Sequence, residues 1–123
     1  MNNLQKLTQV FVQSPWLDNL SRDLIDNGGL QAYVDQGVRG VTTNPTILEN
    51  AIAKSDTYTA QIKQLAAEGL DAREIYWRIV EDDVKRATDI LRPVWEQSGH
   101  LDGYVSIEVS PDLATDASAT LAQ

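Results

Sequence analysis

The chain contains no cysteine and only one histidine, His100. The lack of cysteine excludes disulfide bonds and thiolate metal sites, and a single histidine beside Gly99 in an expected loop is a poor basis for a metal centre. No apolar run is long enough to span a bilayer, and the amino-terminal residues lack the hydrophobic segment of a signal peptide. These absences predict a cytoplasmic protein without a metal site and without a membrane partner.

Positive charge is also scarce. The 123 residues include 10 Lys and Arg against 18 Asp and Glu, which gives a formal net charge of -8. Such a surface repels nucleic acid, so we expect no nucleic-acid partner. The hydrophobic fraction of 42% is ordinary for a globular protein, and the length suffices for one domain but not for two. We therefore treat residues 1–123 as a single domain.

Hydrophobic periodicity predicts an alternation of strands and helices. Strands are expected at 11–18, 38–43 and 104–110, and helices at 22–36 with a break at 27–29, at 46–53, 55–69 and 71–97, and after Pro111. The helix from 71 has an Asp-x-x-Glu capping pattern, and Pro93 is expected to kink it or end it early. This order favours an α/β fold with parallel strands and helical crossovers.

Three strands are few for such a fold. A closed barrel takes eight strands and roughly 250 residues, and an open doubly wound sheet takes about five strands. The chain therefore looks like part of a larger fold. A parallel sheet edge left uncovered invites pairing with another chain, so self-association through this edge is expected.

Polar residues follow two of the expected strands. Gly40–Leu48 passes from a strand through Thr42 and Asn44 into a helix whose first position is Pro45. Strand 104–110 alternates strictly and places Glu108 on its polar face. Ligand sites of α/β folds lie at the carboxyl ends of strands, which makes these residues candidates for binding. The alternative is purely structural, with Asn44 as a helix cap and Glu108 as a solvated strand residue.

Three segments resemble the transaldolase family. Gly40–Leu48 is similar to its amino-terminal signature, Ser106–Val109 resembles its third-strand motif, and Trp16–Ile25 resembles the first-strand segment of the longer bacterial type. The segments occur in the family's order, and the similarity extends over residues 13–123. The resemblance implies the first three βα units of a (β/α)₈ TIM barrel of the class I aldolase kind.

The resemblance also implies an activity. Transaldolases transfer a dihydroxyacetone unit from a ketose phosphate, such as sedoheptulose 7-phosphate, to glyceraldehyde 3-phosphate in the pentose phosphate pathway. They form a Schiff base with a lysine and use no metal or organic cofactor. By motif, Asp18 is implied as the acid/base, Glu108 as the partner of a water in Schiff-base formation, and Asn44 and Thr42 as substrate-binding residues. Without the resemblance, the structural alternatives are favoured, with Asp18 as a helix cap, Glu108 as a solvated strand residue and Thr42 as a strand former.

One part of the family pattern is missing. The Schiff-base lysine belongs to a fourth strand, whereas no lysine of this chain falls on an expected strand. We therefore expect these 123 residues alone to have no transaldolase activity. Two rival hypotheses stay open: a small complete enzyme that uses Asp18 and Glu108 as paired carboxylates, and a non-catalytic interaction domain that pairs through its open sheet edge.

Overall fold

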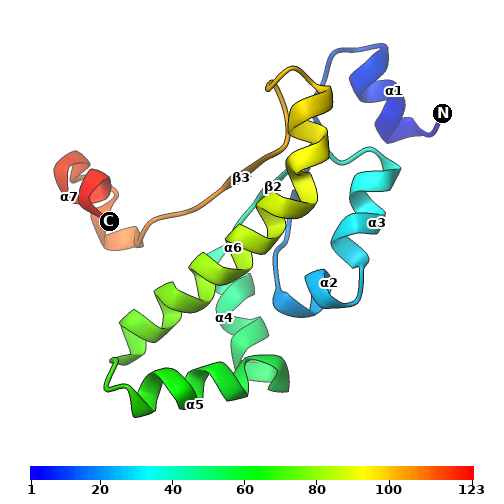
Figure 1. The fold of residues 1–123 in the computed structure, drawn as a ribbon. Helices are drawn as coiled ribbons and strands as arrows, with labels where there is room; N and C mark the ends of the chain where they lie inside the picture. Colours follow the sequence, from blue (N-terminus) through cyan, green and yellow to red (C-terminus); the bar gives the residue numbers. More distant parts are fainter.

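The structure is a computed structural model that describes residues 1–123, and it is organised around three short parallel strands. These are β1 (Trp16–Asp18), β2 (Gly40–Thr42) and β3 (Tyr104–Ser106), which pair in chain order. Both connections between strands run through helices (Figure 1). The predicted α/β fold with parallel strands and helical crossovers is confirmed, and it is consistent with part of a TIM barrel.

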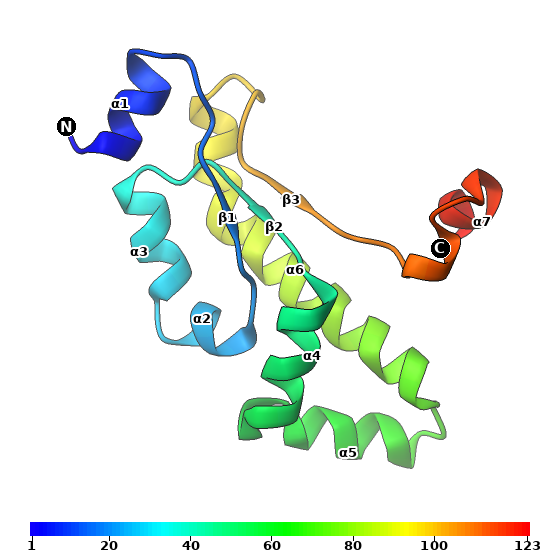
Figure 2. The ribbon, with the colours of Figure 1, turned by 180° about the vertical axis from the view of Figure 1, so that it is seen from behind.

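The two crossovers differ greatly in length. Between β1 and β2 the chain forms α2 (Arg22–Asp26) and α3 (Gly29–Gln36). Between β2 and β3 it forms α4 (Pro45–Lys54), the 3₁₀ turn η1 (Asp56–Tyr58), α5 (Thr59–Ala67) and α6 (Ala72–Gln97). Outside the sheet lie α1 (Asn3–Gln9), the 3₁₀ turn η2 (Pro111–Leu113) and α7 (Ala117–Ala122), and α7 stands apart from the remaining helices (Figure 2).

Helices cover only one face of the sheet. Val41 in the central strand is fully buried, and Leu17 and Val105 on its two sides pack against the same core. Leu30 and Leu91 from the covering helices are also fully buried in this cluster. Side chains alternate along a strand, so the residues next to Val41, Leu17 and Val105 point to the opposite, open face. Figure 2 views the molecule with the strands in front of α6.

The 26-residue helix α6 is the main support of the sheet. Its start follows the predicted capping box, in which Asp71 accepts from the Glu74 backbone N–H at 2.8 Å and Glu74 accepts from the Asp71 N–H at 2.8 Å. The predicted span to residue 97 is confirmed, so of the two effects expected of Pro93 the early end is wrong. Pro93 is exposed, while its neighbours Leu91 and Val94 are buried and hold the last turns on the core.

All three strands are shorter than predicted, and β2 covers only Gly40–Thr42 of the expected 38–43. Residues 11–15 are not a strand: Phe11 and Val12 follow the end of α1 and are 64% and 88% exposed. The predicted third strand ends at Ser106 because its only partner, β2, ends at Thr42. Apolar alternation continues to Val109, but a strand needs a neighbour for its backbone hydrogen bonds. The expected last helix is likewise divided into η2 and α7.

Candidate active site

Three polar residues lie in one row across the open face of the sheet. The register pairs Asp18 of β1 with Thr42 of β2, and Thr42 with Ser106 of β3. The Thr42 hydroxyl donates to Asp18 Oδ1 at 2.7 Å. The structure thus brings together two of the predicted site residues and adds Ser106, which the sequence analysis did not select. The sequence feature that could have identified Ser106 is the alternation of polar and apolar residues over 104–110, which places Ser106 on the same face as Glu108.

Asp18 is not a helix cap. Helix α2 is capped by Ser21, whose hydroxyl accepts from the Leu24 backbone N–H at 3.2 Å. The Asp18 side chain is exposed and takes part in no ion pair, so its only side-chain partner in the chain is Thr42. The helix-cap alternative for Asp18 is therefore wrong. The second carboxylate oxygen of Asp18 is free to take up a proton from a ligand or to accept a hydrogen bond from a ligand hydroxyl group.

Asn44 caps helix α4, as the structural alternative predicted. Its Oδ1 accepts from the backbone N–H groups of Thr46 at 3.0 Å and Ile47 at 3.3 Å, and Pro45 occupies the first helical position. The Asn44 amide NH₂ group donates no hydrogen bond within the chain. Because the oxygen is fixed by two donors, the amide plane is fixed as well, and its two N–H groups remain available. Capping and ligand binding are compatible at this residue.

Glu108 lies two residues beyond the end of β3. Its backbone N–H donates to the Thr43 hydroxyl at 3.2 Å, and the Thr43 N–H donates to the Ser106 carbonyl at 2.9 Å. The Glu108 side chain is exposed and has no hydrogen bond or ion pair. Thr43, only 4% exposed, thus continues the β2–β3 connection past the last strand pair and fixes the backbone of Glu108. The sequence offered no separate signal for this role of Thr43.

The two candidate carboxylates are not neighbours. Strand β2 lies between them, and two strand spacings amount to about 9.6 Å before the two extra residues that lead to Glu108 are counted. This spacing separates the two backbones, and no hydrogen bond joins the two side chains. A substrate or water has to lie between Asp18 and Glu108 for both to act in one reaction, which weighs against the rival hypothesis of a contacting carboxylate pair.

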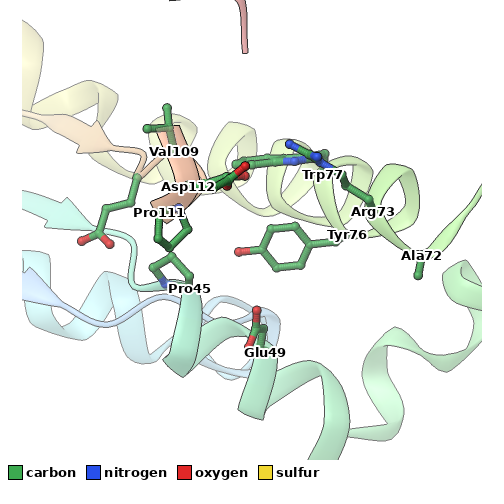
Figure 3. Close-up of a pocket in the computed structure, with 11 residues that line it drawn as sticks. Pro45, Glu49, Ala72, Arg73, Tyr76, Trp77, Val109, Pro111 and Asp112 are labelled. Carbon is green, nitrogen blue, oxygen red and sulfur yellow. The ribbon is translucent and has the colours of Figure 1, made fainter. Parts of the chain in front are cut away.

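A cavity of about 400 Å³ lies beside Glu108 (Figure 3). It is bounded by the start of α4, the first turns of α6 and the segment after β3, and its wall includes Pro45, Tyr76 and Trp77. Burial, followed by the negative charges of Glu49 and Glu108, raises the pKa of Tyr76. Asp18, Thr42 and Asn44 do not line this cavity. The site residues are therefore divided between the open row on the sheet and this cavity.

His100 and the acidic residues form no metal centre. No three His, Cys, Asp or Glu side chains are grouped so that they could hold an ion. The His100 ring instead stacks on Trp95, with 3.6 Å between the ring centroids. A search for membrane-crossing elements gives an equally plain result, since none of the helices is both long and apolar enough to traverse a bilayer.

The fold and the polar row define the class of protein. Parallel strands in chain order, helices on one face and polar side chains at the strand ends are the features of βα-repeat proteins that carry their sites at the carboxyl ends of the strands. The family model named transaldolase/fructose-6-phosphate aldolase matches residues 15–123. The chain belongs to this family.

Three relatives show how much of such a protein the chain represents. It is 47% identical over 123 residues to transaldolase 2 of Nostoc punctiforme, and 47% identical over 122 residues to transaldolase 2 of a second Nostoc strain and to transaldolase of Mycobacterium tuberculosis. These alignments cover 98–99% of this chain. The chain spans 32% of the length of each relative.

Proposed function

We propose that residues 1–123 form the amino-terminal part of a transaldolase barrel domain and supply part of its sugar-phosphate site. The reaction is the transfer of a dihydroxyacetone unit from a ketose phosphate to glyceraldehyde 3-phosphate. Family membership supports the reaction class. The observation that carries the proposal is the Thr42–Asp18 hydrogen bond of 2.7 Å on the open sheet face, which leaves one Asp18 oxygen free at a strand end.

Each residue has a role that fits its contacts. Asp18 transfers the proton of the sugar hydroxyl whose neighbouring C–C bond breaks, and Thr42 holds the carboxylate in place. The free NH₂ group of Asn44 donates to the oxygens of the dihydroxyacetone unit without adding charge beside a cationic imine. Glu108 acts with a water when the amine of the lysine adds to the ketone and water leaves. Ser106 extends the polar row toward Glu108.

The lysine for the Schiff base is not among the residues of this chain. Its four lysines, Lys6, Lys54, Lys63 and Lys85, all lie in helices and are exposed. A Schiff-base lysine has to reach the substrate and needs a lowered pKa, which desolvation provides and an exposed helix surface does not. We propose that the 123 residues alone do not turn over fructose 6-phosphate and erythrose 4-phosphate.

A chimera tests the function directly. This chain replaces the matching 32% of Nostoc punctiforme transaldolase 2, with the unaltered relative as reference. We expect the chimera to be active and the isolated chain to be inactive. Asp18→Asn and Glu108→Gln should each lower kcat of the chimera by about 10²–10⁴-fold, the usual range for general acid/base groups. Asp89→Asn, an exposed carboxyl on α6, is the matched control and should leave kcat unchanged.

Two results would count against the proposal. Turnover by the isolated chain would show that the reaction does not need a lysine from outside it. Full activity of Asp18→Asn in an active chimera would remove Asp18 from the mechanism.

A second candidate function is that of an interaction domain, and a specific observation favours it. β1 and β3 each have one edge without a partner strand, and the side chains of Trp16, Tyr104 and Ile107 beside them are 41%, 46% and 48% exposed. Unpaired strand edges with exposed apolar side chains bind other strands. Pairing with a second copy of the chain through these edges is the form of this function that we propose.

A further inference from the structure

A buried polar network lies beneath the sheet, away from the proposed site. Asp83, in the middle of α6, is completely buried. Its Oδ1 accepts from Arg22 Nε at 2.8 Å, and its Oδ2 accepts from the Tyr58 hydroxyl at 2.9 Å. The Tyr58 oxygen in turn accepts from the Arg22 backbone N–H at 2.6 Å. Three separate elements, α2, η1 and α6, are therefore joined by three side chains.

Stability alone does not account for this network. Burial raises the pKa of Asp83, although Arg22 and Tyr58 both act in the opposite direction. Buried ion pairs recover little more than their desolvation cost, and apolar replacements are often equally stable or more so. Arg22 also lies over the Tyr58 ring, 4.6 Å from its centroid. The cost of burying these polar groups is better explained by the geometry that they enforce.

That geometry concerns the segment after β1. Arg22 is the first residue of α2 and comes four residues after Asp18. Between them, Leu20 is 2% exposed and Ser21 caps the helix. The segment is thus held at Leu20, Ser21 and Arg22, and it has little freedom to move without α2. A shift of the first turn of α2 would be passed to the end of β1, where Asp18 meets Thr42.

We propose that Tyr58 and Asp83 are positioning residues, which act through Arg22 to set the Asp18 carboxylate for proton transfer. Tyr58 contributes the more specific part, because its hydroxyl contacts both the Arg22 backbone and Asp83. The inference rests on the proposed function and on the role of Asp18 in it. A misplacement of about 1 Å at a reacting group can cost on the order of 10²-fold in rate.

The test uses the chimera with Nostoc punctiforme transaldolase 2. Tyr58→Phe keeps the ring and removes only the hydroxyl, and we expect it to lower kcat at least about tenfold while KM changes less than about twofold. Leu91→Ala is the matched control. It removes a fully buried side chain from the same helix α6 and should destabilise the protein without lowering kcat at a temperature well below unfolding.

A double-mutant cycle separates positioning from general damage. In an Asp18→Asn background, the additional Tyr58→Phe substitution should have almost no further effect on kcat, since there is no carboxylate left to position. Equal losses in both backgrounds would overturn the inference, as would an unchanged kcat for Tyr58→Phe. If Asp18→Asn itself has no effect in an active chimera, the proposed role of Asp18 fails first, and the positioning role fails with it.

A measurement on the 123-residue chain tests the inference even when the chimera is inactive. We expect Tyr58→Phe to shift the NMR signals of the Asp18 carboxyl carbon and the Asn19 amide, while signals near Lys63 on α5 stay in place. An unchanged Asp18 signal would overturn the inference whatever the chimera does.

Discussion

At the scale of single residues, Gly103 combines a left-handed backbone with no room for a side chain. It has a φ of 87°, and a Cβ built there would lie 2.5 Å from the Trp95 backbone nitrogen. Gly69 has a similar φ of 90° but nothing within 4 Å of such a Cβ. The pair therefore separates the cost of the left-handed backbone from the cost of a steric clash.

The first prediction uses this pair. We expect Gly69→Ala to lower the free energy of unfolding by about 1–2 kcal/mol, the cost of the left-handed conformation. Gly103→Ala should lower it by roughly 2–5 kcal/mol, because overpacking adds about 1–3 kcal/mol. Urea unfolding followed by circular dichroism measures both values. Equal losses for the two variants would mean that the β3 start moves away from α6 at little cost.

A second residue-scale prediction concerns alkaline pH. The pKa of Tyr76 is raised by burial and by the charges of Glu49 and Glu108, and the pKa of Tyr58 is raised mainly by burial. When the pKa of a tyrosine is higher in the folded than in the unfolded protein, its contribution to the free energy of unfolding is complete below the unfolded-state pKa near 10. This contribution is lost as the pH rises through the folded-state pKa. In Tyr76→Phe, a pH titration followed by tyrosinate absorbance should thus show one tyrosine fewer that ionises above the ordinary tyrosine pKa.

The charges near Tyr76 provide the control. Glu108→Gln should move the late titration toward lower pH, whereas Glu68→Gln at the end of α5 should not. If Glu108→Gln leaves the titration unchanged, burial and Glu49 set the Tyr76 pKa and Glu108 does not face Tyr76 in solution.

Several site residues could be predicted from the sequence, but the contacts between them could not. Thr42 and Asn44 could be selected because strand ends and helix caps have local signals, whereas Asp18 was selected only through the family resemblance. The hydrogen bond from Thr42 to Asp18 could not be predicted, because it depends on a register between strands 24 positions apart. The same holds for Ser106 and Thr43. The assigned roles of Asp18, Asn44, Thr42 and Glu108 stay predictions.

At the scale of elements, α6 shows that packing overrides a local signal. A proline inside a helix removes one hydrogen bond and costs about 3 kcal/mol. Pro93 lies one turn from the end of α6, but buried Leu91 and Val94 keep the helix on the core through Gln97. The sequence therefore predicted the start of α6 correctly from its capping box and its end from its apolar periodicity, whereas the early end expected at Pro93 was wrong.

The third prediction follows from Pro93. Because this residue is exposed and the helix continues past it, Pro93→Ala should restore a backbone donor without disturbing the core. We expect the free energy of unfolding to rise by about 1–3 kcal/mol, less than the full proline cost because proline also restricts the unfolded chain. Thermal and urea unfolding check this value. A loss of stability would indicate that the restricted backbone of Pro93 helps to hold the last turns of α6 on the sheet.

Strand lengths were the main error at this scale. Alternating apolar residues predict how far a strand could extend, whereas pairing determines how far it does extend. β3 ends with the end of β2, and residues 11–15 pair with no strand, although the Pro15 carbonyl accepts from the Arg39 N–H at 2.8 Å. Helix α1 was missed although Asn2 and Gln5 form a capping box, because the short helix has no buried residue and hence no apolar stripe.

At the scale of the whole molecule, helices cover only one face of the sheet, and this determines whether copies of the chain associate in solution. The nine paired strand positions, from Trp16 to Ser106, lie on strands whose open face has no covering helix. The net charge of -8 opposes contact between two copies. Association should therefore depend on salt, because screening weakens repulsion between exposed charges.

The fourth prediction is a sedimentation result. We expect the 123-residue chain to form dimers or larger species, and more of them in 0.5 M salt (about 4 Å Debye length) than at low salt. Ile107→Lys places a charge beside the β3 edge and should restore the monomer. The exposed Leu121→Lys on α7 is the control, since it adds the same charge away from the sheet. A monomer under all conditions would contradict pairing through the edges.

The order of the strands also has a consequence for how the molecule is made. Because β1, β2 and β3 are neighbours in the same order in which they leave the ribosome, β1 and β2 can pair before α6 has been synthesised. Each later strand is added to an edge that already exists, and no early strand waits exposed for a distant partner inserted between its neighbours. Synthesis and assembly can thus proceed in the same direction along the chain.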